Sequence, residues 1–277
     1  MNAPLSLDTP GKFTALVLAG RRGGEDPLAS AAGVSHKCLI PIMGVPMLTR
    51  VLRALANTRQ IGLIGVSIDD PAAAAPALAQ LSEEEAARIR VIASAETPSL
   101  SVAAAIDDLD QPPPLLVTTA DHPLLTPDLI DLFTAEAALS GADLGVGMAP
   151  AADMLAAYPD ARRTWLRFRD DRYTGCNLFA LLTFESRRVL EFWRRVENDR
   201  KRPLRVIRAF GLFSLLAYVS GRLTLAQAME RASIRLGAEV RAIVLRWPDA
   251  AVDVDKPEDL ALVEQILTDR RMKSERT

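Results

Sequence analysis

The sequence predicts a domain of the α/β class, built on a single mixed but mostly parallel sheet that is flanked by helices. Short apolar runs typical of buried strands alternate with longer segments whose apolar residues recur at helical spacing, and this alternation indicates βαβ units. A glycine-bearing turn directly follows the first apolar run, as at the ligand-binding edge of open α/β sheets. With 277 residues, the chain has the length of one large domain or two small ones.

The first half of the chain alternates regularly. Residues 13–19 are apolar and end in a turn, which predicts the first strand, and 46–57 carry apolar residues on one helical face. The elements expected next are a strand at 62–68, a helix at 71–88 broken by a capping box at Ser82 and Glu85, a strand at 89–93, a helix at 99–109 and a strand at 115–120. Right-handed crossovers would bring the carboxyl ends of these strands to one edge of the sheet.

The second half is less regular. Strands are expected at 142–149, 164–168, 177–181 and 239–245, with a polar turn at 169–172 between the second and the third. Helices are expected at 183–198, 205–219, 223–235 and 257–268. We interpret residues 1–12 as a flexible leader and 13–270 as one domain whose two halves share the sheet.

Composition narrows the class of protein. Hydrophobic residues make up 49% and charged residues 25%, which is typical of a soluble globular chain, and the net charge of −2 gives no global bias toward nucleic acid. Cys38 and Cys176 form no metal pattern and are too few for a disulfide framework, so a reducing, cytoplasmic setting is expected. The first residues lack the pattern of a signal peptide, and the longest apolar run, 209–219, is shorter than the roughly 20 residues that span a bilayer.

The loop after the first strand carries both glycines and arginines, in the order Gly20-Arg21-Arg22-Gly23-Gly24. Glycines let phosphate oxygens approach the main-chain N–H groups, and basic side chains beside them add positive charge. The spacing matches neither of the common phosphate loops, G-x-x-x-x-G-K-[ST] and G-x-G-x-x-G. An ordinary strand-turn with a solvated basic loop is therefore as well supported as a phosphate site by this loop alone.

Asp121 follows the apolar strand at 115–120 and precedes His122 and Pro123. A carboxylate at the end of a buried strand suits Mg²⁺, which prefers carboxylate oxygens together with substrate phosphates. The alternative is a turn carboxylate, but residues 126–128 already supply the N-cap, the N1 proline and the first-turn acid of the next helix. Asp121 is thus left without a structural role. Neither His36 nor His122 has metal-ligand spacing, and we assign neither a catalytic role.

These segments resemble the start of the MobA-like NTP transferases, which are nucleotidyltransferases with a Rossmann-like, glycosyltransferase-A-like fold. The strand-end pattern L-A-(A/G)-G, the lysine followed by L-x-P (here with one residue inserted) and the pattern G-x-P-(M/L)-(L/V) are matched by Leu18, Ala19, Gly20, Lys37, Leu39, Pro41, Gly44, Pro46, Met47 and Leu48. The order of glycines and arginines departs from the usual G-x-G-x-R, and 25–36 is longer than usual. Which of Arg21 and Arg22 contacts phosphate stays open.

Near its end the chain resembles the segment D-(I/V)-D-T-P-E-D-L of these families. Asp253 and Asp255 lie two apart and share a face of an extended segment. Asp255 and Glu258 have capping-box spacing before Pro257, so Asp255 is adequately explained as a helix cap. We therefore favour Asp253 as the second metal ligand beside Asp121 and keep Asp255 as an alternative ligand.

Two further segments resemble ligand-binding parts of the same enzymes. Residues 98–106 are similar to a helix start that holds the base or ribose, through Ser99 or Ser101, although a plain N-cap is equally possible. Residues 174–179 form a predicted small polar turn, in which Gly175 and Asn177 would contact the acceptor unless the segment is an ordinary hairpin entry.

The resemblance implies a set of roles. The nucleotide-binding half (about 13–140) would contact the NTP through Leu18, Ala19, Gly20, Arg21, Gly23, Gly24, Lys37, Ser99, Ser101 and Asp121. Catalysis would fall to Lys37, Asp121, Asp253 and Arg22, with Mg²⁺ as the cofactor. The acceptor-binding half (about 141–270) would hold a phosphate-bearing small molecule through Gly175 and Asn177.

The expected reaction is transfer of NMP from an NTP, with CTP or GTP favoured, to that acceptor with release of pyrophosphate. A glycosyltransferase on the same fold and a catalytically inactive nucleotide-binding protein are the alternatives; the first usually carries D-x-D, which Asp121-His122-Pro123 is not. The arginine-dense stretch 187–208 is expected to be a solvated helix face, with contact to a membrane surface or to a partly apolar acceptor as the other interpretation. The oligomeric state, the base and the acceptor are not indicated by the sequence.

Overall fold

A computed structural model describes residues 12–274 except 22–23, 25, 110–111 and 199–216. The proposed leader at 1–12, apart from Lys12, and most of the helix expected at 205–219 lie outside the described residues. The larger elements of the first half are β1 (Phe13–Leu18), α2 (Met47–Ala56), β4 (Ile61–Ile68), β5 (Ile89–Ala93), α5 (Pro98–Leu109), β6 (Leu115–Thr119) and α6 (Pro127–Leu139). Those of the second half are β7 (Leu144–Pro150), α7 (Ala151–Ala157), β8 (Leu166–Arg167), β9 (Arg172–Leu181), α8 (Ser186–Asn198), α11 (Leu225–Leu236), β10 (Val240–Val244) and α12 (Pro257–Ser274).

Short elements connect the larger ones. The loop after β1 leads through α1 (Pro27–Ala31), the 3-10 helix η1 (Lys37–Leu39) and the two-stranded ribbon of β2 (Pro41–Ile42) and β3 (Val45–Pro46). The segment between β4 and β5 holds the 3-10 helix η2 (Pro71–Ala74), α3 (Ala75–Leu78) and α4 (Glu83–Ala87). The 3-10 helix η3 (Pro248–Ala251) precedes α12. The predicted break in the 71–88 helix is confirmed, and Ser82 and Glu85 form a capping box at the start of α4.

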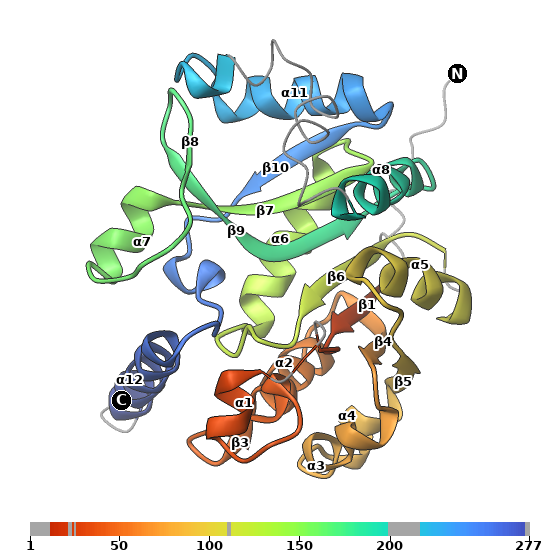
Figure 1. Cartoon of the computed structure of the whole chain (residues 1–277), viewed down its shortest axis with the longest axis vertical. Helices are drawn as coiled ribbons and strands as arrows, with labels where there is room; N and C mark the ends of the chain where they lie inside the picture. Colours follow the sequence, from red (N-terminus) through yellow and green to blue (C-terminus); the bar gives the residue numbers. More distant parts are fainter. Residues whose placement is uncertain (1–11, 22–23, 25, 110–111, 199–216, 275–277) are drawn as a thin grey trace, which may run out of the picture.

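One eight-stranded sheet runs through both halves of the chain, in the order β10-β7-β9-β6-β1-β4-β5, with β8 paired to β9 (Figure 1). The pairs β1–β4, β1–β6, β4–β5 and β7–β10 are parallel, whereas β9 is antiparallel to β6, β7 and β8. The mostly parallel sheet predicted from the alternating pattern is confirmed. Since β1, β4, β5 and β6 are parallel neighbours, their carboxyl ends share one edge.

Each face of the sheet carries its own hydrophobic core. Alternate residues of β1 show this directly, because Ala15 and Val17 belong to the core that packs against α2 and α6, while Leu16 belongs to the core that packs against α5 and α8. Figure 1 shows α2 and α6 on one side of the sheet and α5 and α8 on the other. The sheet is thus the middle of three layers, and its edge residues are held from both sides.

Two local predictions differ from the structure. Strand β9 begins at Arg172, before the predicted strand at 177–181, so Gly175 lies inside a strand and not in a polar turn, while Asn177 lies in a strand as the range 177–181 predicted. Asn177 has a φ of 51° beside a register irregularity against β7, which marks a β-bulge. A local sequence pattern favours a turn for such small polar residues, but pairing with β7 on one side overrides it. Helix α7 was not predicted at all.

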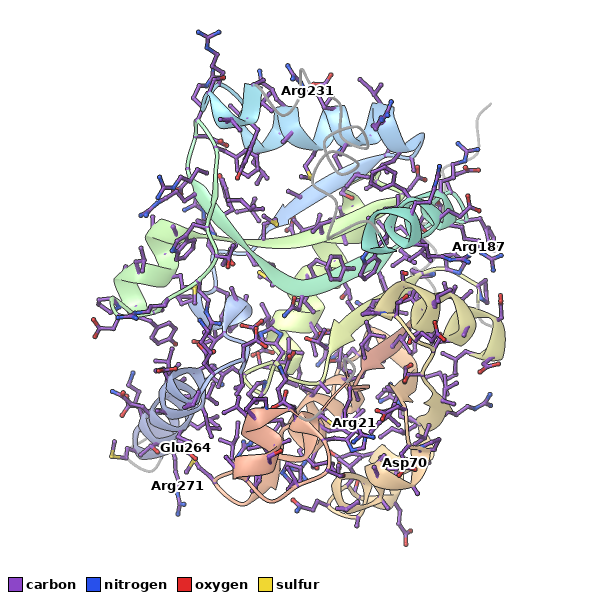
Figure 2. The ribbon with its side chains drawn as sticks, viewed as in Figure 1. Arg21, Asp70, Arg187, Arg231, Glu264 and Arg271 are labelled. Atoms are coloured by element: carbon purple, nitrogen blue, oxygen red, sulfur yellow. The ribbon has the colours of Figure 1, made fainter. Side chains whose placement is uncertain are left out.

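Figure 2 shows Arg187 at the outer surface of α8. Its side chain is more than half exposed and lies 3.9 Å from Asp107 of α5, a weak surface pair. Arg188 pairs with Glu185 three residues earlier. This part of the arginine-dense stretch is therefore a solvated face; residues 199–208 lie outside the described part. No helix among the described residues is both long and apolar enough to cross a membrane.

Candidate functional site

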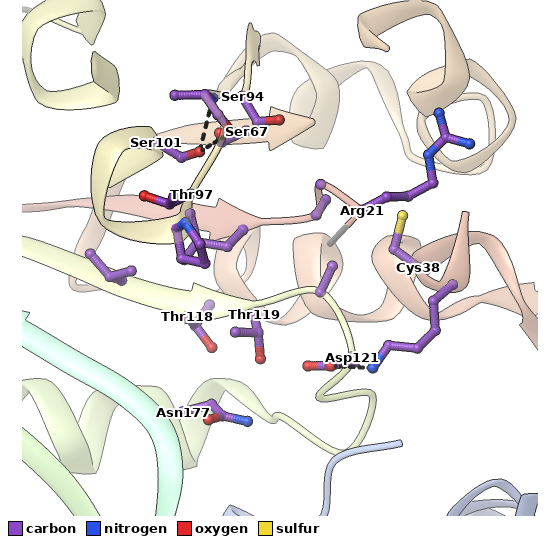
Figure 3. Close-up of a pocket in the computed structure, with 18 of the residues that line it drawn as sticks. Arg21, Cys38, Ser67, Ser94, Thr97, Ser101, Thr118, Thr119, Asp121 and Asn177 are labelled. Atoms are coloured by element: carbon purple, nitrogen blue, oxygen red, sulfur yellow. Dashed lines mark hydrogen bonds and ion pairs between the residues drawn. The ribbon is translucent and has the colours of Figure 1, made fainter. Parts of the chain in front are cut away.

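A pocket of about 650 Å³ opens at the carboxyl edge of β1, β4, β5 and β6 and faces β9. Its wall includes Gly20 and Gly24 of the loop, Lys37 of η1, and Asp121 after β6. Figure 3 shows Arg21 on one side of this pocket and Asn177 on the opposite side, with Thr118, Thr119 and Asp121 between them. The strand ends, the glycine loop and the second half of the chain thus converge on one cavity.

Lys37 lies between two of the predicted metal ligands. Its Nζ donates to Asp121 Oδ2 at 2.7 Å and to Asp255 Oδ1 at 2.8 Å. Burial alone would lower the pKa of Lys37, but the two carboxylates outweigh it and raise the pKa to about 12. The lysine therefore carries a full positive charge inside the pocket at neutral pH.

Asp121 keeps one carboxylate oxygen free of protein partners. Oδ2 accepts from Lys37, while Oδ1 is buried and has no hydrogen-bond partner among the described residues. Burial raises the pKa of this carboxyl, but the neighbouring Lys37 ammonium outweighs it, and the pKa is lowered from its ordinary value. The main-chain oxygen of Asp121 accepts from Val254 N at 2.9 Å, which fixes the strand end against the segment of Asp253 and Asp255.

The carboxylate oxygens in this pocket suit Mg²⁺, but they are too few to hold the ion by themselves. An ionised, unpartnered carboxylate oxygen in a pocket wide enough for phosphates is the kind of ligand that Mg²⁺ uses, because the ion keeps substrate phosphates and waters as its other ligands. Within the described ranges, no group of three or more His, Cys, Asp or Glu side chains forms a ready-made metal cage. Asp121 is the best-placed single ligand, and substrate oxygens would have to complete the coordination shell of the ion.

Asp253, the predicted second ligand, is held by two other side chains. Arg163 Nη1 donates to Asp253 Oδ1 at 2.5 Å and Asn177 Nδ2 donates to Oδ2 at 2.9 Å. Burial and the nearby Asp121 and Asp255 raise the pKa of Asp253, although Arg163 acts in the opposite direction. Asp253 lies beside the site as predicted, but its two oxygens already have protein partners.

The structure corrects the interpretation of Asp255 as a helix cap. Its Oδ1 accepts from Lys37, and the side chain that reaches back to the start of α12 is Asp259, whose Oδ2 accepts from the N–H groups of Asp255 and Lys256 at 3.1 and 3.0 Å. Asp255 is exposed at the pocket rim. The capping role, which was the reason to prefer Asp253 over Asp255 as a metal ligand, belongs to Asp259.

Arg163 was missed by sequence reasoning. It lies in the polar segment between α7 and β8, and its guanidinium contacts Asp253 Oδ1, the Asp253 carbonyl oxygen at 3.2 Å and Asp259 Oδ1 at 3.3 Å. Only 8% of its side chain is exposed, whereas the neighbouring Arg162 is exposed. Nothing in the local pattern separates the two arginines, because the partners lie 90 or more positions away.

The loop after β1 is fixed by Asp69 at the end of β4, a second residue that sequence reasoning missed. Asp69 accepts from Arg21 N and Arg21 Nε at 3.0 and 2.9 Å and contacts the buried His36 Nε2 at 3.0 Å. Burial would raise the pKa of Asp69, but the bonds from Arg21 lower it. An ideal Cβ on Gly20 would lie 2.8 Å from Ser94 Oγ, so this position favours glycine. Arg22 and Gly23 lie outside the described residues.

Of the remaining residues that were predicted to contact ligands, some line the pocket and others do not. Ser101 and Asn177 line the pocket, and Ser101 Oγ accepts from Ala95 N at 2.9 Å. Ser99 is fully buried and its hydroxyl lies 3.1 Å from that of Thr97, which is the residue of this pair that lines the pocket. Gly175 is absent from the described lining. These ligand contacts remain predictions.

Two buried hydroxyls in the wall have no hydrogen-bond partner among the described residues: Ser67 at the end of β4 and Thr118 at the end of β6. The neighbouring Thr119 hydroxyl helps to lower the pKa of Asp121. Buried polar groups are rarely left unpaired, because each costs about 1–3 kcal/mol. Their placement on the pocket wall (Figure 3) therefore indicates a polar ligand. No sequence signal distinguished them from other strand residues.

Behind Asp121 the fold is closed by a buried polar cluster. His122 is 1% exposed, and its Nε2 lies 3.3 Å from the carbonyl oxygen of Asp249. Burial lowers the pKa of His122 to about 4, so the ring is neutral at pH 7. The Asp249 carboxylate accepts from Tyr158 and pairs with Arg270 of α12. This cluster anchors the chain around Asp121 and leaves His122 without access to the pocket.

The comparisons with known proteins agree with this arrangement. The family model of the MobA-like NTP transferase domain matches residues 15–209. The chain belongs to this family. The match includes the glycine loop, Lys37 and Asp121, while the segment of Asp253 and Asp255 lies beyond it. Family membership supports a nucleotidyltransferase, as the resemblance of the loop implied.

Solved structures show the same fold. A hypothetical transferase from Thermus thermophilus is 32% identical, with a TM-score of 0.75 over 90% of this chain and 99% of that one. The 4-diphosphocytidyl-2C-methyl-D-erythritol synthase of Anaerococcus prevotii is 12% identical with a TM-score of 0.57, covering 94% of this chain and 97% of its own. A CMP:2-keto-3-deoxy-manno-octonic acid synthetase complexed with CTP is 14% identical with a TM-score of 0.55, covering 94% and 100%. No curated protein matches the chain. The glycosyltransferase-A-like fold is confirmed.

Proposed function

We propose that the protein transfers NMP from an NTP to a phosphate-bearing small molecule and releases pyrophosphate. The observation that carries this proposal is the pairing, in one pocket of about 650 Å³, of a charged Lys37 with an Asp121 carboxylate whose second oxygen has no hydrogen-bond partner among the described residues. Phosphoryl chemistry needs both a cation for the phosphate oxygens and a ligand for a divalent ion. CTP or GTP is the favoured donor, and the structure bound to CTP among the similar folds supports the first of these.

Each residue has a defined role in the proposed reaction. An ionised phosphate oxygen of the acceptor attacks the α-phosphorus, the bond from that phosphorus to the bridging oxygen breaks, and pyrophosphate leaves. Lys37, one of Arg21 and Arg22, and the loop amides neutralise the negative charge that develops on the phosphate oxygens. Asp121, with Asp255 at the rim, would hold Mg²⁺, which lowers the charge repulsion between donor and acceptor when bound. No general base is needed, because the attacking oxygen is already ionised.

The two alternative functions make different products. A glycosyltransferase would consume a nucleotide-sugar and release a nucleoside phosphate, and an inactive nucleotide-binding protein would bind NTP without any product. Pro123 stands where a D-x-D metal site carries its second aspartate, and its side chain has no oxygen to offer a metal. Detection of pyrophosphate separates the three functions.

Nucleotide binding is the first test. In a thermal-shift screen of the four NTPs with and without Mg²⁺, the preferred NTP at 100 times its Kd should stabilise the protein by about 2.7 kcal/mol. The shift should be larger with Mg²⁺, since the ion shields Asp121 from the triphosphate. Equal shifts by four nucleotide-sugars, and none by NTPs, would favour the glycosyltransferase.

Lys37 should compete with the metal when no nucleotide is bound. Because its Nζ contacts Asp121 and Asp255, Lys37→Met should raise the affinity of the free protein for Mg²⁺, while raising the KM for NTP and lowering kcat. Calorimetric titration with MgCl₂ measures the first effect and steady-state kinetics the second. Lys12→Met is the matched control, because Lys12 is exposed at the opposite end of β1. Unchanged Mg²⁺ affinity and unchanged kinetics in Lys37→Met would remove this residue from the site.

A further inference from the structure

A second cavity, of about 370 Å³, lies against the face of the sheet that α5 and α8 cover. Its floor consists of two rows of residues that are paired across β6, β9 and β7. Phe179 of β9 pairs with Val117 and Val146, and Leu181 pairs with Leu144 in the next row. Val102 of α5 also lines the cavity. The opposite wall is the inner face of α8, with Ser186, Val189, Leu190 and Trp193. The cavity therefore lies between regular elements and is open on one side, as the polar pocket is.

The walls of this cavity are almost entirely apolar. Nine of its ten described lining residues are aliphatic or aromatic, and the tenth, Ser186, donates its hydroxyl hydrogen to the Thr183 carbonyl oxygen at 2.7 Å. No charged side chain is among the described lining. An apolar space of this size beside a ligand pocket indicates a hydrocarbon ligand.

The apolar cavity is continuous with the polar pocket. Val117, Phe179 and Trp193 line both, and the Phe179 and Trp193 rings lie side by side with centroids 6.3 Å apart. Asn177, two residues before Phe179 on β9, lines the polar pocket and donates to Asp253. One molecule can therefore extend from the region of Asp121, Asn177 and Asp253 past Phe179 into the apolar space.

In the proposed reaction, the nucleotide and the acceptor occupy different parts of the polar pocket. Arg21 lies on the far side of Asp121 from Asn177 (Figure 3), next to Gly20 in the glycine loop. A triphosphate at the loop leaves the side toward β9 for the second substrate. The apolar cavity adjoins this second side, through Phe179, and not the glycine loop.

We infer that the apolar cavity binds a hydrocarbon portion of the acceptor, whose phosphate end lies at the Asn177 side of the polar pocket. The acceptor class is thus a monophosphate ester with an extended apolar chain or ring. This inference rests on the proposed function, because only that function makes the bound molecule an acceptor. The binding of an alkyl phosphate across the two cavities does not depend on turnover.

Calorimetric titration with methyl, butyl and octyl phosphate tests the inference, with and without a saturating NTP analogue whose α,β-bridge is a methylene group. Affinity should rise about two- to fourfold for each added methylene until the cavity is filled. Val189→Trp on α8 and Val146→Phe on β7 narrow the cavity from opposite walls and should remove most of this chain-length dependence while methyl phosphate binds as in the wild type. Glu191→Trp, on the exposed side of α8, is the matched control and should retain the full dependence. Thermal melts identify any variant that fails to fold.

Several outcomes would overturn the inference. Equal affinity for methyl and octyl phosphate in the wild type would show that the cavity takes no chain. Chain-length dependence that persists in both narrowed variants would place the chain elsewhere. Loss of NTP affinity in the narrowed variants would assign the cavity to the nucleotide. If the proposed function is wrong, no pyrophosphate is released. That result is measured separately and does not change how affinity depends on chain length.

Discussion

Asp121→Asn should lower the rate of pyrophosphate release by about 10³-fold or more. The carboxylate is the predicted metal ligand and the partner of Lys37, so its neutralisation removes a ligand charge and weakens the bond to the lysine from a charged to a neutral acceptor. The fold should be retained, with a Tm lower by only a few degrees, because asparagine keeps an oxygen at the Oδ2 position and the main-chain bond to Val254 is unaffected. Steady-state assay of pyrophosphate and a thermal melt measure the two effects.

Asp255→Asn is the matched comparison for this variant. Asp255 also contacts Lys37, but its side chain is 61% exposed and lies at the rim, so a smaller loss of rate is expected. If Asp121→Asn keeps most of the activity while Asp255→Asn or Asp253→Asn loses it, the metal ligand has been assigned to the wrong carboxylate. Asp253→Asn should lose stability as well as activity, because it weakens the contact with the buried Arg163.

Arg163→Ala should destabilise the protein by about 3 kcal/mol, at the lower end of the range for breaking a buried ion pair. The substitution leaves Asp253 and Asp259 without their shared cation, and both carboxylates are mostly buried. Activity should fall too, since Asp253 and the segment before α12 lose their anchor beside Asp121. Chemical denaturation at constant pH measures the loss of stability. Arg162→Ala, one residue earlier and exposed, should be nearly neutral.

The stability deficit of Arg163→Ala should depend on pH in a defined direction. The pKa of Asp253 is already raised by burial and by its acidic neighbours, and Arg163 is the group that opposes this rise. Without the arginine the folded-state pKa rises further. The folded state then binds a proton at Asp253 more tightly than the unfolded state does. The stabilisation of the folded state that this proton provides is lost as pH rises through the folded-state pKa. The deficit relative to wild type should therefore be smaller near about pH 4 than near about pH 7. A deficit that grows on acidification would contradict the role of Arg163.

The parts of the molecule that the sequence predicted are those with local signals. The strand from Phe13, the glycine turn and the caps at Ser82 and Thr126 each depend on residues within a few positions of one another. These features needed no knowledge of tertiary packing. Lys37 and Asp121 were both assigned to the site through the family resemblance, and the hydrogen bond between them was not predicted.

The parts that were missed depend on contacts between distant residues. Arg163 meets Asp253 across 90 positions, and Asp69 meets Arg21 across 48, so neither could be chosen from the other charged residues by pattern. Gly175 lies in a strand because Met148 of β7 pairs with it, against its local preference for a turn. The apolar cavity is likewise invisible in the sequence, because its lining residues are ordinary core residues of β6, β7, β9 and α8 whose spacing in three dimensions leaves a space.

The central claim is that the pocket of Lys37 and Asp121 transfers a nucleotidyl group. The most direct test is ³¹P NMR of the wild-type protein incubated with Mg²⁺, the four NTPs and an extract of small phosphorylated metabolites, beside the same mixture with Asp121→Asn. The account predicts that pyrophosphate and a new NMP-linked diphosphate signal grow together, in equal amounts, only with the wild type. Accumulation of NDP or inorganic phosphate in place of pyrophosphate, or equal pyrophosphate with Asp121→Asn, would contradict it.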